Sequence, residues 1–229
     1  MKLGNMFVHC DFQHPDYTIP NQLLRETSFI TEFIVVELRK NKINCFDCGA
    51  IAFMCKDKKE NLRELRAPLY SSVLQVDVLF DPAYFKMDRT QKILYLYDFL
   101  YQSCKTLCSQ KDWDFAPFED AFLKLKENNY IGTHYVRLKC RQGKVTAQLY
   151  GVQEIDKLDF FLEFRTRKGV LCRKFLFRSF QNARDYSQHL GRLEWTENGE
   201  IILYNMFDKP CARMEISEEM LLNSCRESS

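Results

Sequence analysis

The sequence contains little glycine and proline and no long uninterrupted hydrophobic run. Eight Gly and six Pro in 229 residues exclude collagen-like and proline-rich low-complexity chains. The longest apolar stretches, Phe33 to Leu38 and Ile93 to Leu100, carry Glu37 and Asp98 and fall short of the roughly 18 residues that a membrane-spanning helix needs. The residues before Asp11 include one Lys and lack the apolar core of a secretory signal. We therefore expect a cytoplasmic protein that does not contact a membrane.

The sequence also lacks the motifs of the common enzyme classes. It has no G-x-S-x-G, Walker A, G-x-G-x-x-G or H-E-x-x-H pattern. Only four histidines are available as general bases, and one of them, His134, lies within a predicted strand. The sequence therefore favours a protein that is not an enzyme and that uses no cofactor.

Cysteine, in contrast, is abundant, and two of the ten residues form a C-x-x-C at Cys45 and Cys48. Two thiolates on one tight turn make half of a tetrahedral zinc site. No second C-x-x-C exists, so the sequence favours no bound metal. The alternative is a site on Cys45 and Cys48 with His9, Cys10 or His14. In a reducing compartment we expect most of the cysteines to be reduced and buried.

The remaining composition is that of a folded globular protein, with 46% hydrophobic, 28% charged and 14% aromatic residues. We expect one compact unit over residues 1–229. The alternative is a subdivision into an N-terminal segment, 1–66, and a second part, 67–229.

The first of these segments has weak signals. Residues Met6 to Phe12 favour a short strand, and breaks are expected at His14 to Asp16 and at Ile19 to Asn21 because the residue before Pro avoids the helical region. Residues 29–38 fit a helix by the spacing of Phe29, Phe33 and Val36, and a strand by their β-branched run. Both interpretations stay open.

From Val73 onward the periodicity is clear. Alternation from Leu74 to Phe80 predicts a half-buried strand. Asp88 and Gln91 have the spacing of a capping box, and they precede an apolar stripe at helical spacing. Pro117 suits the first turn of a second helix. The stripe comprises Ile93, Leu96, Tyr97, Leu100, Cys104, Leu107 and Cys108.

The rest of the chain contains short segments that are predicted to be strands. They come in pairs, and a turn with a glycine separates the two members of each pair. The pairs are 134–141 with 144–150, 158–165 with 170–178, and 193–196 with 201–204, and 211–216 adds a last strand. Strands that follow one another through such turns pair as an antiparallel meander. The predicted fold is α+β: an antiparallel β-meander in the C-terminal half packed against two central helices, with a mixed N-terminal segment. In 170–178 the basic and apolar residues do not alternate consistently, which predicts either two covered faces or a bulge.

Charge is distributed unevenly, although the net charge is only +2. The segment from Arg137 to Arg192 contains thirteen Lys or Arg but only five Asp or Glu. Acidic residues outnumber basic ones from Glu194 to Glu219. Such a sheet face attracts an acidic protein or a nucleic acid. It also has a simpler explanation, because alternate strand positions must face water and basic residues protect sheet edges. The predicted binding residues are Arg137, Lys139, Arg141, Arg165, Arg167 and Lys168.

In size and general style the chain is similar to the small intracellular α+β immunity proteins that bind and neutralise a toxin. No residue role follows from that resemblance. The expected function is a non-catalytic protein-binding module, of this immunity type, with an acidic protein partner. The alternative is a nucleic-acid-binding protein that uses a basic β-sheet face, and a small metal-dependent enzyme comes third.

Overall fold

The structure is a computed structural model that describes residues 3–12, 18–41, 48–63, 65, 72–179, 188 and 190–217. The chain divides into two compact units: unit 1 comprises residues 1–132 and 154–156, and unit 2 comprises residues 133–153 and 157–229. The sequence favoured a single unit, and its alternative boundary at residue 66 falls inside unit 1. The division follows from two separate hydrophobic cores, because each is closed by side chains of its own unit.

Unit 1 contains a three-stranded parallel sheet in the order β1-β2-β3. Val8 lies opposite Phe53, which in turn lies opposite Val76. The sequence indicated only a mixed segment here, because parallel partners are joined by long connections rather than by a recognisable turn. The strands span Asn5–Cys10 (β1), Ala50–Lys56 (β2) and Val73–Leu79 (β3).

Helix α1, Ile19–Lys40, lies in the chain between β1 and β2. It resolves the ambiguity of residues 29–38 in favour of a helix, because buried Leu23, Ile30 and Ile34 recur at helical spacing. The break expected at residues 19–21 is wrong. Pro20 lies in the first turn of α1, where its missing N–H removes no helical hydrogen bond.

Two further helices, α2 (Arg89–Lys111) and α3 (Ala116–Glu127), begin where the sequence predicts. The Asp88 carboxylate accepts a hydrogen bond from the Gln91 N–H at 2.9 Å, and the Gln91 side chain accepts one from the Asp88 N–H at 3.1 Å. The capping box is thus confirmed. Two short 3-10 helices, Lys59–Asn61 (η1) and Pro82–Lys86 (η2), complete unit 1. None of the helices in the described segments is long and apolar enough to cross a membrane.

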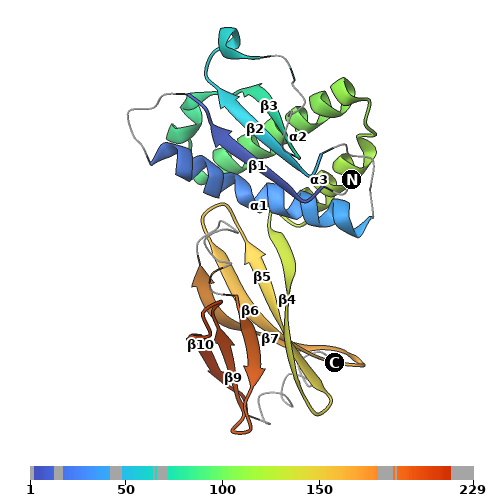
Figure 1. Ribbon diagram of the computed structural model, residues 1–229, viewed down its shortest axis with the longest axis vertical. Coiled ribbons are helices and arrows are strands. Elements are labelled where there is room, and N and C mark those ends of the chain that lie inside the picture. Colours follow the sequence, from blue (N-terminus) through green and yellow to red (C-terminus); the bar gives the residue numbers. More distant parts are fainter. Residues whose placement is uncertain are drawn as a thin grey trace. The chain divides into compact units, whose positions relative to one another are not determined.

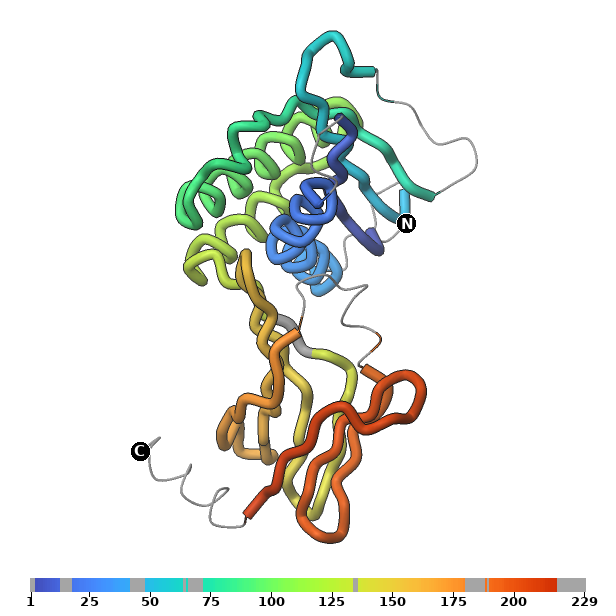
Figure 2. Tube along the Cα trace, turned by 90° about the vertical axis from the view of Figure 1, so that its left-hand side faces the viewer, coloured from blue at the N-terminus to red at the C-terminus, as the bar shows by residue number. Residues whose placement is uncertain are grey.

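The apolar stripe of α2 is buried, as its spacing predicts. Leu96, Leu100 and Cys104 are at most 1% exposed. They share a core with Met6 of β1 and Phe53 of β2, and Figure 2 shows the three helices on one side of the parallel sheet. The helices therefore have a different partner from the expected meander, because periodicity shows which face is buried but not what covers it.

Unit 2 contains only strands among its described residues, in two antiparallel sheets (Figure 1). Four strands form a meander in the order β4-β5-β6-β7, and three form a sheet in the order β10-β9-β8. With the helices of unit 1, this confirms the predicted α+β class and its antiparallel meander. The strands span Gly132–Gln142 (β4), Val145–Gln153 (β5), Leu158–Thr166 (β6), Gly169–Ser179 (β7), Arg192–Trp195 (β8), Glu200–Tyr204 (β9) and Pro210–Glu215 (β10).

The pairing of β6 with β7 is interrupted by two register shifts. At one of them Phe160 lies opposite Phe177 and Phe161 lies opposite Phe175, so Leu176 is an extra residue. The bulge that the sequence offered as an explanation of the mixed alternation is thus confirmed. It places Phe177 in the core, stacked on Phe160 at 4.8 Å, while Phe175 is 52% exposed.

The second sheet supplies part of the core of unit 2. Leu203 of β9 joins Leu162 and Phe164 of β6 in one buried cluster. Trp195 of β8 meets the Phe164 ring edge-to-face at 5.9 Å. One face of the meander is therefore apolar and covered, which leaves its other face to carry the charged side chains.

Candidate functional site

The predicted binding residues begin on β4, where basic and apolar side chains alternate. Leu138 and Cys140 pack against the core of unit 2. Burial there raises the pKa of the Cys140 thiol to about 11. Because successive strand residues point to opposite faces, Arg137, Lys139 and Arg141 lie on the other side of the meander, and all three are exposed. These three residues are called the basic face below.

Two hairpin turns lie side by side at one end of the meander. Gly143 stands in the β4–β5 turn with φ 57°, in the left-handed region that favours glycine. Thr166 and Gly169 close the β6–β7 turn as Cα partners. Since β5 and β6 pair from Thr146 and Arg165 onward, the two turns are neighbours.

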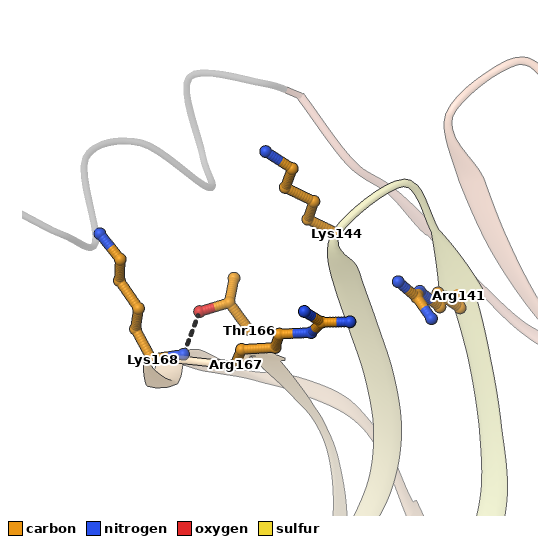
Figure 3. Close-up of a pocket in the computed structure, with 5 residues that line it drawn as sticks. All are labelled: Arg141, Lys144, Thr166, Arg167 and Lys168. Atoms are coloured by element: carbon orange, nitrogen blue, oxygen red, sulfur yellow. Dashed lines mark hydrogen bonds between the residues drawn. The ribbon is translucent and has the colours of Figure 1, made fainter.

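A cavity of about 580 Å³ opens between these turns (Figure 3). Arg167 extends from the β6–β7 turn toward the β4–β5 hairpin, which carries Arg141 and Lys144 (Figure 3). The Arg141 Nε–H donates to the Gly143 carbonyl at 2.9 Å, and the Lys168 backbone N–H donates to Thr166 Oγ1 at 3.2 Å. This cavity is called the cationic pocket below. Its described lining is Arg141, Lys144, Thr166, Arg167 and Lys168.

Other basic residues of the meander are neutralised by buried carboxylates. Glu163 is fully buried, and its carboxylate lies 2.9 Å from Arg173 Nε and 3.6 Å from Arg165 Nε. Asp159 accepts hydrogen bonds from Arg178 at 2.6 and 3.0 Å. Arg165 is one of the six residues that the sequence predicts as binding residues. The structure places its guanidinium beside the Glu163 carboxylate, so its charge is already balanced there.

Six further cations, on β4 and at the two turns, are not neutralised in this way by any described residue. Within the part of the chain that the structure describes, no carboxylate lies within ion-pair distance of any of them. They include five of the six predicted binding residues, and Lys144 is one that the prediction missed. Lys144 could have been found from its place at the second position of the Gly143 turn, next to Arg141. The six are Arg137, Lys139, Arg141, Lys144, Arg167 and Lys168.

An aromatic pair was also missed. Phe161 and Phe175 meet edge-to-face at 5.7 Å on the same side of the meander as the ion pairs, because the bulge at Leu176 turns Phe175 outward. Beside them the Arg173 guanidinium lies 4.4 Å from the centre of the Tyr150 ring. Only the mixed alternation of 170–178 hinted at this arrangement.

The residues of the alternative metal site are only partly described. Cys45 and His14 lie outside the described residues. Cys48 is buried, and burial raises the pKa of Cys10 and lowers that of His9, although the charge of Asp11 opposes the shift at His9. Among the described residues no three His, Cys, Asp or Glu side chains are placed to hold a metal ion.

In unit 1 a charged cluster lies at the carboxyl ends of the parallel strands. Lys56 pairs with Asp11 and lies 4.0 Å from Asp77, and Arg63 Nε lies 3.0 Å from Asp77. Burial acts to raise the pKa of Asp77, but the hydrogen bonds of Arg63 and the charge of Lys56 outweigh it, so this pKa is lowered. Two cations meet two carboxylates, and the cluster is therefore electrically balanced. Through Arg63 and Asp77 it joins the segment that follows β2 to strand β3.

Comparison of the chain with protein-family models, with curated proteins and with solved structures finds no match.

Proposed function

We propose that this protein is a non-catalytic intracellular binding module whose partner is an acidic protein surface. The basic face and the cationic pocket contact that partner. The observation that carries the proposal is the group of six cations along β4 and at the two adjacent turns, which no described carboxylate neutralises. A partner that brings carboxylates to this surface reduces the mutual repulsion of the cations and is drawn to it by long-range attraction.

The neighbouring side chains support a protein partner. Arginine and aromatic residues are enriched at the centres of protein interfaces, and Phe161 and Phe175 offer a partly exposed apolar contact. On β6 the buried carboxylates of Asp159 and Glu163 pair with Arg178 and Arg173, so those two arginines do not extend the unneutralised basic surface across the sheet. A basic surface of limited extent suits a protein better than a nucleic acid strand, which follows a continuous basic groove.

The narrower form of the proposal is a toxin partner, as for immunity proteins. An intracellular location fits the cysteines, because none of the eight that the structure describes forms a disulfide. Identification of the native partner decides between a toxin and another acidic protein.

The proposal is tested with a charge reversal and a matched control. The native partner is captured on the immobilised protein, identified by mass spectrometry and purified for kinetic measurement. Lys139→Glu with Arg167→Glu changes the proposed contact surface, whereas Lys209→Glu with Arg213→Glu makes the same change of charge at exposed positions of the second sheet. We expect the first variant to slow association with the purified partner about tenfold or more, and the control to have little effect.

Two results contradict the proposal. One is equal association rates for both variants, which makes the cations only a hydrated surface. The other is binding of RNA or DNA that falls steeply with salt and is abolished by Lys139→Glu with Arg167→Glu, with no protein partner. That result establishes the nucleic-acid alternative.

A further inference from the structure

Strand β4 forms one edge of the meander, because the order of that sheet is β4-β5-β6-β7 (Figure 1). It spans eleven residues, about twice the length of an average strand. The outer side of an edge strand presents backbone N–H and C=O groups that no neighbouring strand satisfies. Among the described residues, no group forms a hydrogen bond with the outer backbone edge of residues 137–142. A strand from another molecule can therefore pair with β4.

The β4–β5 turn determines which residues of β4 direct their backbone groups to this edge. The turn has two residues, and the first is Gly143 with positive φ. In such a hairpin the flanking residues, Gln142 and Val145, exchange backbone hydrogen bonds, and every second residue back along β4 does the same with β5. The Val136 carbonyl, which accepts from the Gln148 side chain of β5 at 3.2 Å, agrees with this alternation. The three residues of the basic face therefore direct their N–H and C=O groups outward.

The other outer strands of unit 2 carry features that discourage a further strand. Register shifts interrupt β7 and β10, β10 also begins with Pro210, and β8 spans only four residues. Strand β4 carries the three cations of the basic face instead. Pairing of β4 with a second copy of itself would bring cations against cations, which is unfavourable. The charge thus disfavours self-association and leaves the edge open to a strand of opposite charge.

We infer that the acidic partner adds an extended segment to the edge of β4, with carboxylates at every second residue. The inference rests on the proposed function and names the form in which the partner presents its acidic residues. The backbone of the segment pairs with the outward N–H and C=O groups of the basic face. Its alternate side chains, about 7 Å apart, match the spacing of the three cations. An acidic helix is a poorer match, because its backbone groups are already paired and its residues share a face every three or four positions.

The test compares two labelled peptides of equal length and composition in fluorescence anisotropy at low salt. In one peptide glutamate alternates with threonine, and in the other all glutamates follow all threonines. Attraction by net charge acts on both peptides alike. Only the alternating peptide, when it is extended, places all of its carboxylates on one side. We expect the alternating peptide to bind about fivefold more tightly.

Amide hydrogen exchange, followed by NMR, shows whether the backbone of β4 takes part. In the free protein the amides of the basic face should exchange fast, whereas those of Leu138 and Cys140, which point to β5, should exchange slowly. Saturation with the alternating peptide should slow exchange at the basic face about tenfold or more, because these amides become hydrogen-bonded. Contact through side chains alone leaves them exposed. Leu138 and Cys140 serve as the internal control.

The outcomes separate this inference from the proposed function. Equal binding of both peptides, absence of binding by either, or unchanged exchange at the basic face overturns strand addition. In each case slower association of the native partner with the Lys139→Glu, Arg167→Glu variant still supports an acidic protein partner. Slowed exchange at the basic face in the concentrated protein alone would show a second copy on this edge and would overturn the choice of an acidic segment.

Discussion

Truncation of Leu100 tests where the core of unit 1 lies. Its side chain is 0% exposed and belongs to the stripe by which α2 packs on the parallel sheet. Leu100→Ala removes buried methyl groups and leaves a cavity, which together cost about 2–5 kcal/mol in well-packed cores. Leucine and alanine both favour helices, so the helix propensity of α2 changes little. The expected loss in the free energy of unfolding therefore reports packing.

The two tryptophans of the chain allow each unit to be followed separately. Trp113 belongs to unit 1 and Trp195 to unit 2. In a Trp195→Phe background, urea unfolding monitored by tryptophan fluorescence reports unit 1. If the slope of the transition stays constant, the shift of its midpoint gives the change in stability.

Leu94 provides the matched control, because it lies on the same helix and is 45% exposed. Leu94→Ala should cost only about 0.5 kcal/mol, as is usual for surface substitutions. The reasoning is refuted if Leu100→Ala costs no more than Leu94→Ala. That result would mean that the stripe does not face the core.

Two further predictions concern ionisable groups. The lowered pKa of Asp77 means that its ionised carboxylate stabilises the folded state above about pH 4 and that this contribution is lost as the pH falls through the lowered pKa. Asp77→Asn should therefore reduce the free energy of unfolding at pH 7, and the gap to the wild type should narrow toward pH 3; an equal gap at both pH values would contradict the assignment. In native protein treated with an alkylating reagent and followed by mass spectrometry, exposed Cys211 should react well before buried Cys104, whose pKa is raised by desolvation. Equal rates at the two thiols would show that Cys104 is not enclosed.

The elements that the sequence predicts well are those that local chemistry determines. Asp88 and Gln91 satisfy each other's backbone N–H groups, and the hairpin around Gly143 needs a residue that tolerates positive φ. Such signals lie within a few residues of the element they create. They locate the start of α2 and the antiparallel hairpins without knowledge of the rest of the fold.

The sequence says much less about which strands and helices pack against one another. Val8 and Phe53 are neighbours only because α1 carries the chain back to a parallel strand, and no residue between them records that register. The apolar stripe of α2 likewise fits any apolar surface of the right shape. The two separate cores depend on such long-range contacts, which no local pattern in the sequence records.

The meander that carries the candidate site contains one strand that the sequence predicts well, β4, and one that it does not, β7. The basic face on β4 follows from simple alternation, and the structure confirms that alternation at Leu138 and Cys140. On β7 the alternation fails, because two register shifts change the phase of the strand. The sequence indicates an irregularity in this strand. It does not show which cations the irregularity pairs with carboxylates.

The shifts on β7 determine which charges remain for a partner. Continued pairing from the turn would place Cys172 opposite Glu163, but the first shift places Arg173 there instead. The second shift brings Arg178 opposite Asp159, where it donates two hydrogen bonds. Each shift thus pairs a buried carboxylate with an arginine of β7. Because Arg173 and Arg178 are paired with carboxylates, a count of charges along the sequence overstates the basic surface on β7, whereas the six cations on β4 and at the two turns have no described carboxylate within ion-pair distance.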